Sequence, residues 1–162
     1  MIQRRQTIFM LLSAIISALL FFVPLMTFKA NDSVMSFTIF GIENPVEGIT
    51  LSQSYTWPLI VLAALMTILP FYTLLRYKKR QHQVKMCQLD LLLNIVFIGV
   101  VFLYYEADIQ QVIAAVEGET YQLEVAYFIG MAIPLVNLVL EILAIRGIKK
   151  DIELLKSIDR LR

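Results

Sequence analysis

Residues 6–28 read QTIFMLLSAIISALLFFVPLMTF, an uncharged run of 23 residues between Arg5 and Lys29. A helix of about 20 apolar residues crosses the ~30 Å hydrocarbon layer of a membrane. A cleaved secretory signal is the alternative, but its apolar core has only ~7–15 residues, and Phe28-Lys29-Ala30 lacks the small-x-small cleavage pattern. We therefore expect the first membrane span near residues 6–28.

Three further apolar stretches follow this run. The first of them, residues 57–75, begins with Trp57-Pro58, and proline suits the first turn of a helix. The other two, residues 91–105 and 125–140, reach span length only if Asp90 and Glu141 lie within their helices. The expected spans are 6–28, 56–76, 86–106 and 124–146.

The composition agrees with a membrane protein. The chain has 162 residues, of which 59% are hydrophobic and 17% charged, and its mean hydropathy is +0.73. Soluble domains have about 45–50% apolar and about 25% charged residues, so a disordered chain, a coiled coil and an ordinary soluble enzyme are excluded. The net charge of +1 gives no reason to expect a nucleic acid partner. The partners we expect are the lipid bilayer and another membrane protein or a second copy of the chain.

The sequence carries no recognisable catalytic or metal-binding motif. It has no phosphate-binding glycine loop, no paired-histidine metal motif and no nucleophile elbow. Its single cysteine, Cys87, cannot form an intrachain disulfide, and its single histidine, His82, lies in a basic segment. We expect no catalytic residue, no metal and no cofactor.

The charged residues indicate the orientation. Thirteen of the 14 Lys and Arg residues fall before the first span, in residues 76–85 or from Arg146 onward. Eight acids fall on the opposite side, and an excess of Lys and Arg in short loops marks the cytoplasmic face. Both termini are therefore expected in the cytoplasm. Aromatic residues that favour the headgroup region gather at the expected outer boundary: Tyr55, Trp57, Tyr104, Tyr105, Tyr121 and Tyr127.

The expected fold class is an all-α membrane protein, a single domain over residues 1–162 with four transmembrane helices. Its outer loops are 29–55 and 107–123, its inner loop is 77–85, and its cytoplasmic tail is 147–162. Residues 33–40 are rich in β-formers and 47–54 could return as a second strand, which gives either a small β-hairpin cap or an irregular loop. Residues 108–115 are expected to continue the third helix until Gly118 ends it.

The tail is expected to be an amphipathic helix. It repeats apolar residues at helical spacing: Ile148, Ile152, Leu155, Ile158 and Leu161. Two acids, Asp151 and Asp159, interrupt the apolar stripe. Docking onto the bundle or a partner is therefore as consistent with the pattern as lying on lipid.

Four polar residues within the spans are the candidate site. Asp90 and Asn94 share one face of the third helix, and Asn137 and Glu141 share one face of the fourth, so the two pairs can meet. Polar groups within a span mark either a specific structural pair or a path for protons or ions. In the structural interpretation, the carboxylates pair with Arg76, Arg146 or the N-terminal arginines, and the asparagines bond between helices.

Small residues and prolines offer further signals. The pairs Ser13/Ser17, Ala14/Ala18 and Ala126/Gly130 have the spacing that permits close helix contact, within the monomer or in a dimer. Prolines within or near the ends of the spans, Pro24, Pro70 and Pro134, are typical of kinks. Four spans without an inverted repeat make a transporter a weak interpretation.

The two ends of the chain and the start of the third span carry a resemblance. Its residues are Met1-Ile2-Gln3-Arg4, Gln6-Thr7, Met86-Cys87-Gln88-Leu89, Gly147-Ile148-Lys149-Lys150-Asp151 and Ser157-Ile158-Asp159-Arg160-Leu161-Arg162. With these motifs the chain resembles domain-of-unknown-function family 4293, small four-span inner-membrane proteins of Gram-negative bacteria. The resemblance covers nearly the whole chain, although Arg5 stands where an apolar residue is expected. It implies no activity, and it implies a cytoplasmic cluster of Arg4, Asp159, Arg160 and Arg162.

Three functions follow as hypotheses. The first is a non-enzymatic scaffold, assembly or accessory factor that acts through its cytoplasmic ends. The second is a path for a small solute, an ion or protons through Asp90, Asn94, Asn137 and Glu141. The third is a membrane enzyme whose chemistry lies in the outer loop without a recognisable pattern.

Overall fold

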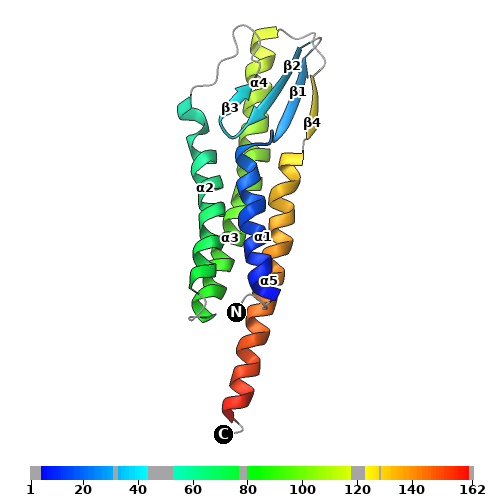
Figure 1. Cartoon of the computed structure of the whole chain (residues 1–162). Coiled ribbons are helices and arrows are strands. Elements are labelled where there is room, and N and C mark those ends of the chain that lie inside the picture. The colour runs from blue at the N-terminus through cyan, green and yellow to red at the C-terminus, as the bar shows by residue number, and fades with distance from the viewer. Residues whose placement is uncertain are drawn as a thin grey trace.

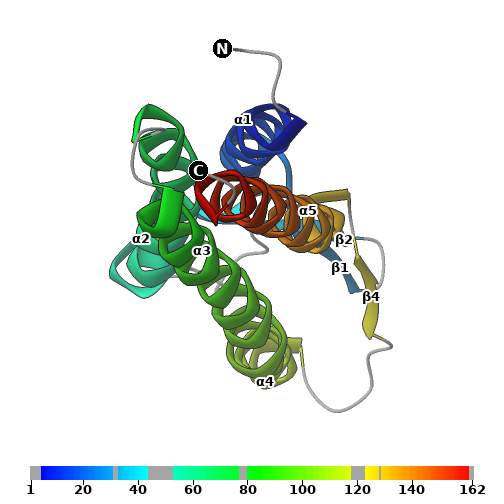
Figure 2. The ribbon, with the colours of Figure 1, turned by 90° about the horizontal axis from the view of Figure 1, so that it is seen from below.

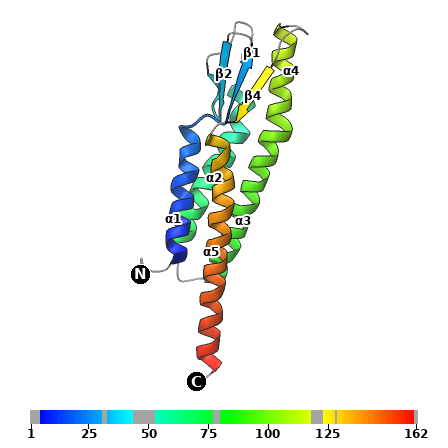
Figure 3. The same cartoon turned by 90° about the vertical axis from the view of Figure 1, so that its right-hand side faces the viewer.

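The structure is a computed structural model that describes residues 5–30, 33–43, 53–76, 80–117, 123–127 and 129–160. Its long helices run side by side along one axis, and a small sheet caps one end of them (Figure 1). At the other end the last turns of helix α5 extend beyond the other helices (Figures 1 and 3).

The first helix ends earlier than the sequence predicts. Helix α1 (Arg5–Ala18) continues through one 3₁₀ turn, η1 (Leu19–Phe21), and strand β1 (Met26–Ala30) follows. Pro24 disfavours the helical conformation of the residue before it, and the chain after it forms a strand in which Met26, Thr27 and Phe28 are buried and Lys29 is exposed. The expected span at 6–28 is therefore wrong over its last seven residues, which form a turn and the start of a strand.

The cap is a four-stranded antiparallel sheet, so the chain is mostly helical rather than all-α. Strands β1, β2 (Ser33–Thr38), β3 (Gly41–Glu43) and β4 (Leu123–Tyr127) lie in the order β3-β2-β1-β4. A hairpin including residues 33–40 is present, but its partner strands are β1 and β3. The expected return strand at 47–54 is wrong at its end, where Gln53 begins a helix, and residues 47–52 lie outside the described residues.

Helices α2 (Gln53–Leu75) and α3 (Arg80–Val100) match the second and third expected spans most closely. Helix α2 starts before Pro58, which therefore lies inside the helix rather than in its first turn. Helix α3 starts six residues before the expected position 86, so most of the expected inner loop 77–85 is helical. It continues through the π-helical turn η2 (Val101–Tyr105) into α4 (Glu106–Glu117), as expected from residues 108–115.

The last helix, α5 (Ile129–Arg160), is one continuous helix of 32 residues. The expected fourth span at 124–146 is wrong at its start, because residues 123–127 form β4 and pair with β1. Ala126 and Gly130 therefore lie on different elements and form no helical contact motif. The tail expected after Gly147 is helical, and it continues α5 without a break.

Three of the described helices are long and apolar enough to cross a membrane. They cover Tyr55–Leu75, Arg80–Gln111 and Ile129–Leu154, which have 21, 32 and 26 residues. A fourth apolar helix, Gln6–Phe21, is shorter. Since ~20 residues suffice for the hydrocarbon layer, the three long helices identify a membrane protein.

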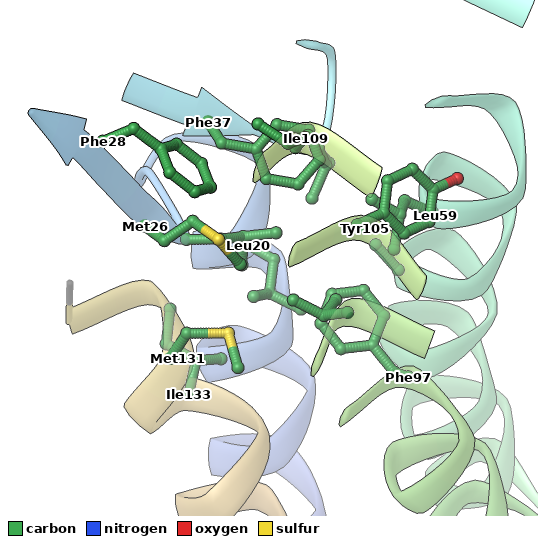
Figure 4. Close-up of a cluster of buried hydrophobic side chains, with 14 of the residues drawn as sticks. Leu20, Met26, Phe28, Phe37, Leu59, Phe97, Tyr105, Ile109, Met131 and Ile133 are labelled. Carbon is green, nitrogen blue, oxygen red and sulfur yellow. The ribbon is translucent and has the colours of Figure 1, made fainter. Parts of the chain in front are cut away.

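The main hydrophobic core lies where the sheet meets the helix ends (Figure 4). Phe28 and Phe37 of the sheet pack there with Leu20 of η1, Phe97 of α3 and Tyr105 of η2, all at most 1% exposed. The rings of Phe37 and Tyr105 lie 5.7 Å apart, and the Tyr105 hydroxyl donates to the carbonyl oxygen of Tyr55 at 2.7 Å. The sheet is thereby fixed to both α2 and η2.

Candidate functional site: a buried polar layer between three helices

A group of polar side chains lies buried where α1, α3 and α5 meet. Helix α5 packs against both α1 and α3, and Figure 2 shows these helices seen along the bundle. We call the group the polar layer; its members, each at most 3% exposed, are Ser13, Ser17, Asp90, Asn94, Asn137 and Glu141.

Two amide groups link α5 to its neighbours. The Asn94 Nδ2 atom donates to Glu141 Oε1 at 2.7 Å and to the carbonyl oxygen of Asp90 at 3.2 Å. The Asn137 Nδ2 atom donates to Ser17 Oγ at 2.7 Å. Hydrogen bonds of this kind between apolar helices contribute about 0.6–2 kcal/mol each. The polar layer therefore fixes which face of α5 meets α1 and which meets α3.

The lower part of the polar layer surrounds a cavity of about 10 Å³. Three of its lining residues, Ser13, Asp90 and Glu141, each have a buried side-chain oxygen without a hydrogen-bond partner among the described residues. A water molecule needs a cavity of about 10–15 Å³, so the cavity accommodates one particle of that size. Its other lining residues are Phe9, Met10, Pro70, Thr73, Cys87 and Ala144.

The two carboxylates do not pair with the described arginines. In the part of the chain that the structure describes, no salt bridge joins Asp90 or Glu141 to a basic side chain, and the Arg76 guanidinium lies 5.3 Å from the centre of the Tyr72 ring. The Arg4 and Arg5 side chains lie outside the described residues. The expected pairing with Arg76 or Arg146 is therefore wrong, whereas the asparagines bond between helices as the structural interpretation predicts.

Sequence reasoning missed the two serines as members of this group. Ser13 and Ser17 are four residues apart, which places both on one face of α1, and this spacing was interpreted only as that of small residues that permit close helix contact. The signal that could have found them is their helical spacing combined with their hydroxyls, because a buried asparagine needs a partner for its amide.

Below the polar layer, close contacts hold the ends of the helices together. Gln83 Nε2 donates to the carbonyl oxygen of Thr73 at 3.0 Å, which joins α3 to α2. A Cβ atom on Gly147 would lie 3.3 Å from Gln6 Cβ, so α5 and α1 approach closely there. Arg80 and Asp151 form a partly exposed salt bridge at 3.8 Å.

The proposed terminal cluster is not tested by these contacts. Arg4 and Arg162 lie outside the described residues, and so do the side chains of Asp159 and Arg160. The last turns of α5 extend away from the first described turn of α1 (Figure 3), so the course of the ribbon gives the cluster no support.

The isolated reactive residues form no centre. Cys87 is 4% exposed and free, and His82 is half-buried at the start of α3. No group of three or more His, Cys, Asp or Glu side chains within the described ranges could hold a metal ion.

Comparison with known proteins gives a family and no function. No curated protein and no solved structure matches the chain. A family model described as "Domain of unknown function (DUF4293)" matches residues 2–161, nearly the whole chain. The protein therefore belongs to the DUF4293 family.

Proposed function

We propose that the protein is a non-enzymatic scaffold or assembly factor of a bacterial inner membrane. In this proposal it crosses the membrane four times, with both termini in the cytoplasm and the sheet on the outer side. It binds another membrane protein, or a second copy of itself, through its cytoplasmic end.

The surface of α1 supports a fourth crossing. The outward side chains of α1 and of η1, which continues it, are apolar and between 40% and 54% exposed: Ile8, Leu11, Leu12, Ile15 and Leu19. Water would penalise such a surface, whereas lipid tails would not. The 17 residues from Arg5 to Phe21 measure about 25 Å as a helix, so α1 needs a slightly thinned bilayer or the sheet above it to complete the crossing.

The charges support the orientation. Basic residues gather at the end of the bundle away from the sheet (Figure 1); the described ones are Arg76, Arg80, Arg146 and Lys149. Acids dominate the other end, where Glu43, Glu106 and Asp108 lie. By the positive-inside rule, the end of the bundle that carries the arginines faces the cytoplasm.

The single observation that carries the proposal is the uninterrupted extension of α5. The helix passes beyond the other helices (Figure 1), with Glu153 and Ser157 exposed and Leu154 54% exposed. A rigid helix that leaves a bundle presents a surface at a fixed distance from the membrane. Such a helix suits attachment of a partner better than chemistry.

The test is truncation after Ile152. This change leaves the buried Ile148 and the whole polar layer in place, so we expect an unchanged melting temperature in detergent. We expect that partners which cross-link to the full chain in intact cells do not co-purify with the truncated chain. They should still co-purify with a control variant, Leu65→Ala, which changes an exposed side chain of α2. Retention of every partner by the truncated chain would contradict the proposal.

A second candidate function is a path for protons or ions through Asp90, Asn94, Asn137 and Glu141. The observation that favours it is the burial of two carboxylates around one cavity, because ionisable groups within a membrane are costly and mark such paths. Proton or ion flux into liposomes that contain the protein tests it. Flux that equals that of protein-free liposomes would leave the scaffold as the better proposal.

A further inference from the structure

The cavity within the polar layer has the features of a ligand site in its own right. We propose that Ser13, Asp90 and Glu141 bind one small monovalent cation, either an alkali metal ion such as Na⁺ or a proton held by water or by the carboxylates. This inference does not depend on the scaffold function, because a bound cation can hold helices together without passing through them.

The first argument is charge. The two carboxylates, 2% and 3% exposed, line the same cavity. Helix α1 contributes Phe9, Met10 and Ser13 to it, and α2 contributes Pro70 and Thr73, so the only further titratable group is Cys87 of α3. No basic side chain is among the residues that line the cavity. An isolated buried carboxylate is very costly, so one positive charge within the cavity greatly reduces the cost.

The second argument is the arrangement of free oxygen atoms. Asn94 occupies Glu141 Oε1, which leaves Glu141 Oε2 without a partner, and Asp90 Oδ1 and Ser13 Oγ are also unpaired. These three atoms come from three different helices. Hard cations such as Na⁺ prefer oxygen ligands of this kind, and a hydroxyl can act as a neutral third ligand beside the two carboxylates.

The third argument is size. A volume of about 10 Å³ corresponds to about one water-sized particle. An organic cation would not fit, and Phe9, Met10 and Ala144 form an apolar part of the lining. The site therefore selects by size as well as by charge.

The experiment measures the melting temperature of the full-length chain in detergent or lipid nanodiscs. NaCl is titrated against choline chloride at equal ionic strength, and pH is varied separately without Na⁺. A ligand at a hundred times its dissociation constant raises the melting temperature of a chain of this size by roughly 5–10 °C. We expect that rise with Na⁺ or on mild acidification, and its loss in the double variant Asp90→Asn/Glu141→Gln.

The controls separate the site from general charge effects. Glu153→Gln makes the same chemical change at an exposed position of α5, and it should respond as the wild type does. If the double variant fails to fold, Ser13→Ala keeps both carboxylates, and it should shift the Na⁺ midpoint at least several-fold. A rise with Na⁺ identifies the metal ion, and a rise with acid alone identifies the proton. The proposal is overturned if the wild type responds to neither, or if Asp90→Asn/Glu141→Gln and Ser13→Ala respond as the wild type does.

Discussion

Gly130, the second residue of α5, lies directly against the turn that joins η1 to β1, and its replacement by alanine tests this arrangement. A Cβ atom at this position would overlap the Pro24 carbonyl oxygen, and it would lie 2.9 Å from the Pro24 carbonyl carbon and 3.1 Å from Leu25 Cα. All three atoms belong to the backbone, so no side-chain rotation relieves the clash. Overpacking of this kind costs about 1–3 kcal/mol.

Gly99→Ala is the matched control. A Cβ atom on Gly99, in α3, would meet nothing within 4 Å, so the control variant gains only the helix propensity of alanine, about 0.5–1 kcal/mol. If Gly130→Ala gains a similar propensity term, the free energies of unfolding of the two variants differ by the steric cost alone. At ~2–4 °C per kcal/mol, this cost predicts a gap of roughly 2–12 °C in melting temperature, with Gly130→Ala the lower.

Thermal unfolding of the two purified variants in the same detergent measures the gap. A Gly130→Ala chain that melts at or above Gly99→Ala would refute the close approach of α5 to the Pro24 turn. It would also reopen the possibility that the first helix continues to residue 28, because the early end of α1 creates this contact.

Two further contacts and the orientation in the membrane are each open to a separate test. Asn94→Leu removes the only donor to Glu141 Oε1 among the described contacts, and it should lower the free energy of unfolding in denaturant titrations by about 1–3 kcal/mol. The control Gln110→Leu loses only a weak 3.4 Å contact, so it should change this free energy by less than ~0.5 kcal/mol. Tyr105→Phe should cost about 0.5–1.5 kcal/mol by the same measurement, since its hydroxyl bonds the Tyr55 carbonyl; an unchanged midpoint would argue against this link between α2 and η2. Tags at both termini should not react in intact cells with labelling reagents that cannot cross the membrane, whereas a tag between β1 and β2 should react. Termini that are labelled on opposite faces of the membrane would contradict four crossings.

The helices that the sequence predicts best are those bounded by charge. The uncharged run before Arg76 predicts the end of α2 within one residue, since a charged side chain after a long apolar stretch marks the end of a span. The meeting of the third and last helices was also predictable, because polar residues four apart on an apolar helix need partners on a neighbouring helix.

The early end of α1 was not predicted, because hydropathy measures composition and not conformation. Residues 22–28 are as apolar as the helix before them, yet Leu25, Met26 and Phe28 lie fully buried in the core between the sheet and the helix ends. The local signal was Pro24, which disfavours a helical conformation of the residue before it. The pairing of β1 with β4 joins residues about a hundred positions apart, so no local pattern could reveal it.

Gly147 shows how one residue type can have two meanings. Glycine after a run of apolar residues often ends a helix, and the separate tail was expected to begin at this residue. Here α5 continues through Gly147, and the missing side chain lets Gln6 of α1 approach. A glycine that ends a helix cannot be distinguished by sequence from one that permits close packing, because both need only the absence of Cβ.

The polar layer has a role that apolar packing cannot fill. In lipid, an apolar face loses little when it is exposed, so burial of apolar surface alone does not favour one rotation of α5 over another. Asn137 and Glu141 lie on one stripe of α5, yet the first bonds to Ser17 of α1 and the second accepts from Asn94 of α3. A rotation or a one-residue slip of α5 would break both bonds and leave buried polar atoms unpaired on three helices. The same atoms that fix the register leave Glu141 Oε2, Asp90 Oδ1 and Ser13 Oγ unpaired, so specific packing and a small charged cavity arise together from one set of residues.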